Sequence, residues 1–207
     1  MAATEQRVEH DAAAHGHDGH VTTTGISNSK LAMWVFLGSE CLLFGGLIST
    51  FLLYKDNAVA GGPLPRDLYD IEFTSISSFV LLMSSLTMVL AVASIGRGDH
   101  TRLRLWLAAT AILGSVFIAG QAYEFQVFVE EGMGFTTNAA SSAFFALTGF
   151  HGVHVTLGIV MLLSTLLLSL AGKIPTTNAE AVEIVGLYWH FVDVVWVLIF
   201  TVVYLIK

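Results

Sequence analysis

Five long apolar stretches constrain the fold of this chain more than any other feature. A helix needs about 20 apolar residues to cross the hydrocarbon core of a bilayer. Of the 207 residues, 55% are hydrophobic and only 12% are charged, which is far from the usual composition of soluble domains. We therefore predict an all-α, polytopic membrane domain over residues 31–207, with spans at 31–54, 73–95, 105–123, 142–171 and 182–206.

The positive charges predict the orientation of these spans. If the N-terminus is cytoplasmic, six lysines and arginines lie inside and three lie outside, in agreement with the excess of positive charge on cytoplasmic connections. The inner six are Arg7, Lys30, Arg97, Arg102, Arg104 and Lys173, and the outer three are Lys55, Arg66 and Lys207. We expect the N-terminus inside and the C-terminus outside. The net charge of −7 and the lack of a basic patch exclude nucleic acid as an expected partner.

Residues 1–30 are polar and contain no apolar segment typical of a signal peptide. We predict a disordered, histidine-containing cytoplasmic tail. A metal bound by His15, His17 and His20 is the weaker alternative, because nothing around this tract imposes a coordination geometry.

Ionisable side chains inside the spans mark the candidate site, because such groups are costly in a bilayer and are usually functional. Five of them are expected near the membrane midplane, with Glu40 and His190 each roughly 12–13 Å from the inner end of their helix. The five are Glu40, His151, His154, His190 and Asp193. His151 and His154 share one helix face, as do His190 and Asp193, since residues three apart are neighbours on a helix.

Two roles remain open for these groups, a structural one, in which they hold helices together, and a functional one. Asp193 is expected to accept a hydrogen bond from an imidazole or from the indole N–H of Trp189 or Trp196, and His190 and Asp193 then only hold helices together. Glu40 has no basic residue within one turn, so we expect it to be protonated unless a partner or water reaches it, and to act as a proton-linked group or a polar lining.

Glu124 differs from these groups, because it closes the third predicted span near the outer interface. There a carboxylate is readily solvated, and we predict a surface residue or a contact with another subunit.

The histidines also permit two metal-based alternatives. His151 and His190 are possible axial ligands of a haem, and the pair together with Glu40 and His154 offers ligand types suited to a metal ion. We favour neither, because the additional imidazole and carboxyl groups disfavour haem, and neither a repeat nor an evident ion path supports a metal transporter.

Four stretches place these residues in long, specific motifs. They are Trp34-x-Phe36-Leu37-x-Ser39-Glu40, Gly120-Gln121-x-Tyr123-Glu124, Phe144-Phe145-x-Leu147-Thr148-Gly149-Phe150-His151-Gly152-x-His154-Val155 and Tyr188-Trp189-His190-Phe191-Val192-Asp193-Val194-Val195-Trp196. With these motifs the chain resembles subunit III of the haem-copper respiratory oxidases (cytochrome c oxidase polypeptide III), over nearly everything from Trp34 to Ile206.

The resemblance implies a subunit without a redox centre in the aerobic respiratory chain of a bacterial cytoplasmic membrane. Haems and copper are then expected in the partner subunits I and II. This chain is expected to pack on subunit I of a proton-pumping oxidase, near subunit II, with a small subunit IV as a further candidate partner.

The resemblance also implies roles for residues. It predicts a V-shaped cleft that holds phospholipid and supports proton uptake, with Glu40, His151 and His154 as its lipid-linked or proton-linked residues and His154 as the better contact for a lipid headgroup. Trp34, Glu124, Trp189, His190, Asp193 and Trp196 are then expected to hold helices together or to contact other subunits.

Five spans match the compact bacterial forms and lack the two leading helices of the mitochondrial form, so the cleft must be lined differently or closed by another subunit. Three alternatives stay open at this point. They are subunit III of a quinol oxidase, the homologous protein that accompanies nitric oxide reductase, and, more remotely, a stand-alone membrane cytochrome or metal transporter.

Overall fold

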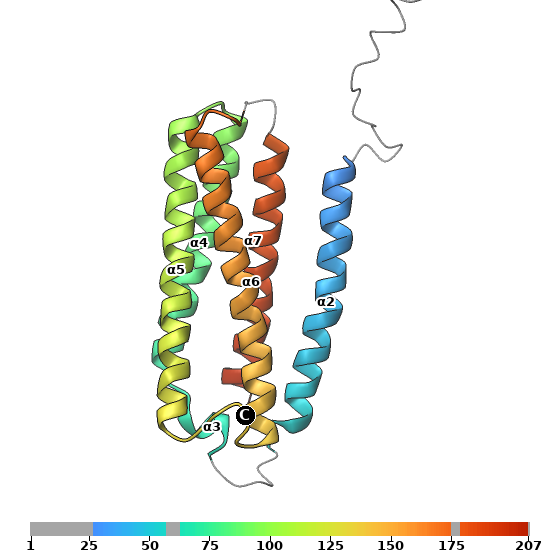
Figure 1. The fold of residues 1–207 in the computed structure, drawn as a ribbon, viewed down its shortest axis with the longest axis vertical. Helices are drawn as coiled ribbons and strands as arrows, with labels where there is room; N and C mark the ends of the chain where they lie inside the picture. The colour runs from blue at the N-terminus through green and yellow to red at the C-terminus, as the bar shows by residue number, and fades with distance from the viewer. Residues whose placement is uncertain (1–26, 57–62, 175–178, 207) are drawn as a thin grey trace, which may run out of the picture.

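The protein is seen here as a computed structural model that describes residues 27–56, 63–174 and 179–206. Five long helices run along one axis, and each is long and apolar enough to cross a membrane (Figure 1). They are α2 (Asn28–Tyr54), α4 (Ile71–Gly96), α5 (His100–Glu130), α6 (Ala139–Leu170) and α7 (Ala179–Phe200), with a short α3 (Pro65–Leu68) and a π-helical turn (Thr201–Leu205) after α7. The predicted all-α fold with five spans is confirmed.

The helices extend beyond most of the predicted spans because polar residues, rather than the loss of hydropathy, decide where they begin. Asp70 and Asp99 accept hydrogen bonds from the backbone at the start of α4 and α5, and Asn138 forms a capping box with Ser141 at the start of α6. Helix α5 therefore begins at His100 and ends at Glu130, whereas hydropathy predicts 105–123.

The connections place the two ends of the described chain at opposite ends of the bundle. The start of α2, the α4–α5 turn and the start of α7 lie at one end, and α3, the α5–α6 connection and the C-terminus lie at the other (Figure 1). This is the arrangement that an odd number of spans requires. Which end faces the cytoplasm stays a prediction from the charge distribution.

Helices α4 and α5 share the most extensive contact, and the buried residues of α5, apart from Ala111, follow one another at spacings of four and three. This is the spacing of a coiled-coil seam, which places one continuous stripe against neighbouring helices. The stripe consists of Leu103, Leu107, Thr110, Gly114, Phe117, Gln121, Glu124 and Phe128.

Trp189 of α7 lies at the centre of the bundle and has no exposed surface. A Cβ atom built on Gly114 of α5 would lie 2.5 Å from the indole ring, and one built on Gly158 of α6 would lie 2.8 Å from it. Only glycine leaves room for the ring at these two positions. The indole Nε1 donates to Ser84 of α4 at 2.9 Å, so one side chain contacts three neighbouring helices.

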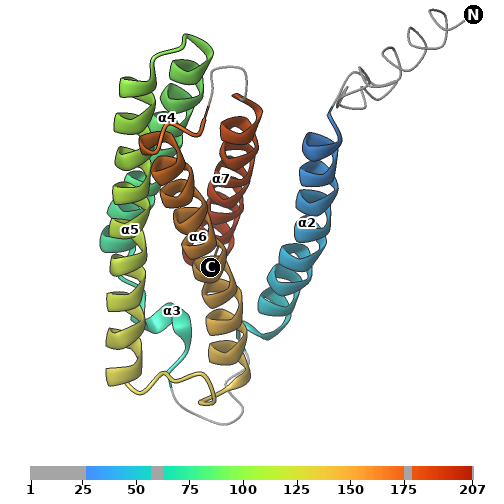
Figure 2. The ribbon, with the colours of Figure 1, turned by 45° about the horizontal axis from the view of Figure 1, so that its top comes forward.

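Helix α2 stands beside this four-helix bundle and contacts only α6 and α7 among the long helices to any large extent (Figure 2). Its buried residues are Leu37, Phe44 and Phe51, each seven positions apart. A Cβ built on Gly38, Gly45 or Gly46 would meet nothing within 4 Å. These three glycines therefore bring no other helix of the described chain close to α2, and this face of α2 is open.

Candidate functional site

Glu40 of α2 and His154 of α6 form a pair where these two helices meet. Glu40 Oε2 lies 3.1 Å from His154 Nε2, and the side chains are 14% and 11% exposed. The ring of Phe44 packs edge-on against His154 at a centroid distance of 5.0 Å and shields the pair on one side. The polar partner that Glu40 needs inside a membrane is thus supplied from a position 114 residues later.

The hydrogen bonds determine how many protons this pair holds. His154 Nδ1 lies 2.8 Å from the carbonyl oxygen of Phe150, which can only accept, so Nδ1 carries a proton and donates. One further proton then lies between Nε2 and the Glu40 carboxyl. Whether it resides on the oxygen or on the nitrogen, the pair as a whole is neutral.

Both nitrogens of His154 are thus occupied within the chain. Contact of His154 with a lipid headgroup stays a prediction. A headgroup would have to displace Glu40 or Phe150 to reach them.

His151 lies one turn away on α6 and is completely buried. Its ring stacks on Trp196 at a centroid distance of 4.9 Å, and the rings of Phe117 and Phe44 pack edge-on against it. Neither ring nitrogen has a hydrogen-bond partner among the residues that the structure describes. Phe44 touches both histidines, so His151 lies beside the Glu40–His154 pair.

His190 and Asp193 belong to a second group, which lies between α7 and α4. His190 Nδ1 is 2.7 Å from the hydroxyl of Ser85. Asp193 is 3% exposed, and neither of its carboxyl oxygens forms a hydrogen bond with the described residues, although the Ser85 hydroxyl lies beside it.

The prediction that an imidazole or an indole N–H donates a hydrogen bond to Asp193 is therefore wrong. Trp189 donates to Ser84 and Trp196 donates to Ser78, both at 2.9 Å, because α4 presents a row of serines to α7. Sequence reasoning missed these serines. The signal that could have found them is the number of serines in an otherwise apolar span.

The expected surface position of Glu124 is also wrong. Its side chain is 5% exposed, and its carboxyl accepts from Thr74 at 2.7 Å, from Tyr204 at 3.1 Å and from Gln121 at 3.3 Å. The carboxyl thus links α5 to α4 and to the π-helical turn. Burial, together with the nearby Glu124 carboxyl, raises the pKa of the neighbouring Tyr69 hydroxyl well above its usual range.

Trp34 belongs to neither group. Trp34 is 56% exposed on α2, which leaves it available for another subunit or for lipid. Within residues 27–56, 63–174 and 179–206, no three histidine, cysteine or carboxylate side chains converge as metal ligands would. The predicted metal tract of His15, His17 and His20 lies outside the described residues.

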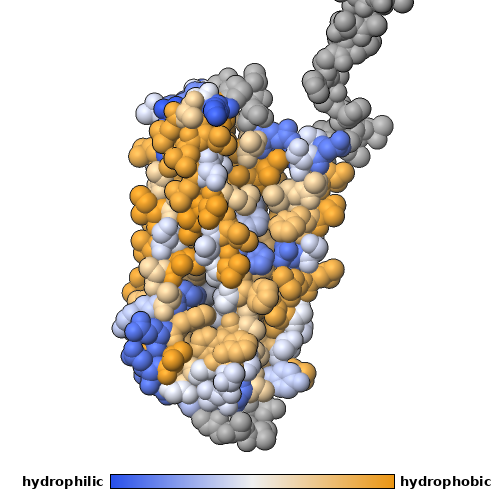
Figure 3. All heavy atoms as spheres, viewed as in Figure 1, coloured by the Kyte–Doolittle hydropathy of each residue, from blue (hydrophilic) through white to orange (hydrophobic). Residues whose placement is uncertain are grey.

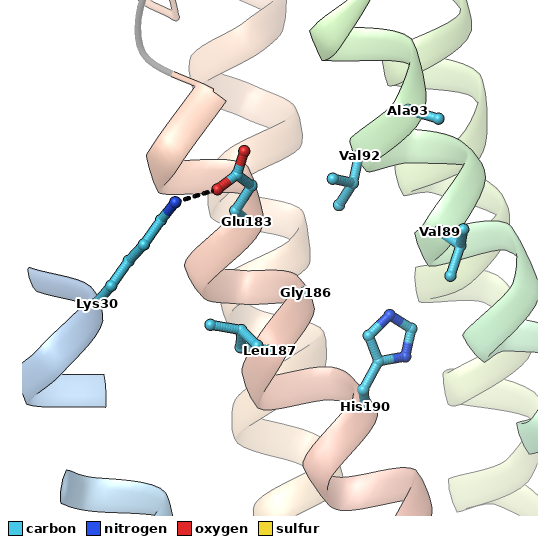
Figure 4. Close-up of a pocket in the computed structure, with 8 residues that line it drawn as sticks. All are labelled: Lys30, Val89, Val92, Ala93, Glu183, Gly186, Leu187 and His190. Atoms are coloured by element: carbon cyan, nitrogen blue, oxygen red, sulfur yellow. Dashed lines mark ion pairs between the residues drawn. The ribbon is translucent and has the colours of Figure 1, made fainter. Parts of the chain in front are cut away.

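A second contact between α2 and α7 was not expected from the sequence. Lys30 Nζ forms an ion pair with Glu183 Oε2 at 2.5 Å, and Ser27 bonds Glu180 one turn earlier on α7. Below this ion pair lies a groove of about 500 Å³ (Figure 4). Its lining consists of Lys30, Val89, Val92, Ala93, Glu183, Gly186, Leu187 and His190.

The surface of the bundle agrees with a membrane setting. Figure 3 shows mostly apolar residues along the length of the bundle and strongly polar residues chiefly toward its two ends, with a few polar residues halfway along this face. Large hydrophobic side chains are exposed on all five long helices. Fold and site together define a polytopic membrane protein that pairs several of its ionisable side chains inside the bilayer.

Comparison with known proteins identifies the family within that class. The sequence model of the protein family described as "Cytochrome c oxidase subunit III" matches residues 1–207 of the chain. The chain therefore belongs to the cytochrome c oxidase subunit III family, which makes it subunit III of a haem-copper oxidase, part of a respiratory oxidase complex.

The relatives include oxidases named for either electron donor. Cytochrome c oxidase subunit 3 of Bacillus sp. (strain PS3) is 41% identical over 178 residues, which are 86% of each chain. Quinol oxidase subunit 3 of Bacillus subtilis (strain 168) is also 41% identical, over 198 residues that cover 93% of this chain and 96% of the relative. Cytochrome c oxidase subunit 3 of the same strain is 41% identical over 187 residues, or 89% of each chain. The equal identities do not distinguish the two donors.

Proposed function

We propose that this chain is a non-catalytic subunit that packs on subunit I of a cytochrome c oxidase, binds phospholipid, and supports proton uptake and the integrity of the catalytic subunit during turnover. The observation that carries the proposal is the Glu40–His154 pair. It holds one proton that can move between an oxygen and a nitrogen without a change in net charge.

The position of the pair supports a role in proton supply rather than in packing alone. Both side chains retain some exposure at the edge of the bundle, where α2 meets α6. A proton exchanged here does not have to enter the close-packed core around Trp189. The cost of carrying a charge in the membrane is reduced because each member of the pair compensates the other.

The exposed side chains of α2 support lipid binding. Val35, Leu42 and Leu53 are among its most exposed residues, and the adjacent open glycine positions leave the backbone accessible to acyl chains or to another helix. A headgroup would meet the Lys30–Glu183 ion pair near the start of the helix rather than the ring nitrogens of His154, which are bonded within the chain.

Replacing Glu40 with Gln in the assembled oxidase tests the proposal. The amide keeps a hydrogen bond to His154 but cannot exchange a proton. Initial oxygen consumption should stay near that of the parent, while activity should decline faster over prolonged turnover. Glu130→Gln is a matched control, because Glu130 is an exposed carboxyl at the end of α5.

Two results would overturn this function. One is immediate and complete loss of oxygen reduction in a fully assembled Glu40→Gln complex, which would give this chain a catalytic role. The other is a lifetime equal to that of the Glu130→Gln control. Co-purification with subunit I and a copper-bearing subunit II separates this function from a nitric oxide reductase accessory protein, and a haem spectrum in the purified single chain would favour a cytochrome.

A further inference from the structure

The groove between α2, α4 and α7 combines an apolar wall with one hydrogen-bonding group set deep inside it. Val89, Val92 and Leu187 supply much of the wall, and Val89 is half exposed at its edge. Figure 4 shows the imidazole of His190 pointing from α7 toward α4 at one end of the groove, with the Lys30–Glu183 ion pair at the other end. Glu183 and His190 are seven residues apart, or roughly 10 Å along the helix.

This depth restricts the chemistry of an occupant. A phospholipid has its polar groups near the interface, level with Lys30 and Glu183, and would place only acyl chains beside His190. The Lys30 charge is moreover already compensated by Glu183 at 2.5 Å. A ligand that uses His190 needs an apolar body that carries a hydrogen-bonding group well below the headgroup region.

Ser85 and Asp193 control whether His190 presents a donor or an acceptor to that ligand. If Asp193 is ionised, the Ser85 hydroxyl can turn toward it and accept a bond from His190 Nδ1–H, which leaves Nε2 as an acceptor. If Asp193 is protonated, its O–H can turn toward Ser85, and the serine then donates to Nδ1, which makes Nε2–H a donor. The 2.7 Å contact of Ser85 with His190 and the unpartnered, buried carboxyl of Asp193 are both used in this arrangement.

We propose that the groove is a binding site for a membrane-dissolved quinone and its quinol, anchored at Nε2 of His190. A quinone and its quinol differ in hydrogen bonding just as the two tautomers of His190 do. The carbonyl of a quinone needs a donor, and the hydroxyl of a quinol binds to an acceptor. Binding requires only hydrogen bonds. The imidazole stays neutral in both states, and the gain or loss of one proton at Asp193 changes its tautomer and so matches the site to either form.

The groove itself is tested with the complete oxidase complex, depleted of native quinone and then saturated with ubiquinone-2. Val89→Phe fills the groove from its exposed edge and leaves the three polar residues Ser85, His190 and Asp193 in the sequence. This variant should bind one quinone fewer per complex than the parent. Val194→Phe makes the same change at another exposed valine, on α7 and outside the groove, and should bind the parental number.

The anchor is tested by infrared spectroscopy with ubiquinone-2 labelled with ¹³C at its carbonyls. His190→Phe should remove the frequency shift of one hydrogen-bonded carbonyl. Ser85→Ala should weaken binding of ubiquinone-2 and of its quinol by about three- to tenfold, the effect of one ordinary hydrogen bond. Ser75→Ala should change neither, because Ser75 bonds only to the carbonyl of Ile71 on its own helix.

The proposal is overturned if the Val89→Phe complex binds as many quinones as the parent. It is equally overturned if the carbonyl bands are identical in the parent and in His190→Phe, or if a phospholipid retained in the groove is not displaced by saturating ubiquinone-2. Val89 lies at the surface, so this result can be obtained even if His190→Phe prevents assembly. None of these outcomes depends on the long-term activity of the Glu40 variant.

Discussion

Helices α4 to α7 and helix α2 are similarly apolar but pack in different ways. The mean hydropathy of the best window is 1.8 in α2 and between 1.7 and 2.2 in the other four. Only 11% of that window is buried in α2, against 33–50% in the others. The four-helix bundle is held by an indole ring set between glycines and by a buried carboxyl with three donors. Helix α2 is held by three large apolar side chains and by polar pairs to α6 and α7.

This difference indicates which part of the molecule is close-packed and which part stays open to its surroundings. In lipid, burial of apolar surface does not drive helices together, so close packing and hydrogen bonds have to do so. The four-helix bundle satisfies both conditions. Helix α2 satisfies mainly the second, and the proton-holding pair lies where it meets the bundle.

The strongest test of this difference replaces one tryptophan in each region. Trp189→Ala should destabilise the subunit by about 3–5 kcal/mol, because it empties the centre of the bundle and leaves Ser84 without its donor. Trp34→Ala on α2 should change the thermal midpoint of the purified chain very little. Similar midpoints for the two variants would show that the bundle is not the stable part.

A smaller effect is expected from adding single methyl groups. Gly114→Ala should cost about 1–3 kcal/mol, because the new Cβ would lie 2.5 Å from the Trp189 ring and the ring has to move. Gly45→Ala should have no comparable effect, since nothing lies within 4 Å of that position. Thermal unfolding of the isolated chain in detergent measures both. A loss for Gly45→Ala that appears only in the complete complex would identify this face as a contact with another subunit.

Two hydrogen-bonded carboxyls, those of Glu124 and Glu40, give the next comparison. Glu124→Gln should lower stability by about 1–2 kcal/mol, because an amide has one acceptor oxygen for three donors and its own N–H₂ then faces Thr74 or Gln121. Glu40→Gln should leave stability nearly unchanged, since the amide can still bond to His154. Protease cleavage near the C-terminus reports on Glu124, because Tyr204 loses its acceptor. The comparison fails if Glu40→Gln is the more destabilising of the two.

The smallest effect is expected at the ion pair that connects the start of α2 to α7. Lys30→Ala should cost about 0–1 kcal/mol, because both partners are more than one-third exposed on their side chains and such pairs contribute little. The expected change is in geometry instead. Spin labels on α2 and α7 should report a broader distribution of distances near residue 30 than near residue 40. An unchanged distribution would mean that packing, not the ion pair, positions this end of α2.

Much of this molecule could be predicted from its sequence. The number of spans is a sum of local hydropathy, and the intramembrane positions of Glu40, His151 and Asp193 follow from it directly. The motifs around Glu40, His151 and Trp189 were sufficient to indicate the family. Helix ends were less predictable, as in α5, because a capping aspartate extends a helix into polar sequence.

Partner choice could be determined only from the tertiary structure. Glu40 pairs with His154 and not with His190, Asp193 has no indole donor, and Glu124 is buried rather than exposed. Each outcome depends on how a helix is rotated about its axis and how far it is shifted along its neighbour. These two quantities are set by the packing of all helices together, through contacts such as Gly114 and Gly158 with Trp189. Hydropathy, which adds up residue by residue, therefore determines that these groups lie in the membrane, while packing determines what each of them contacts.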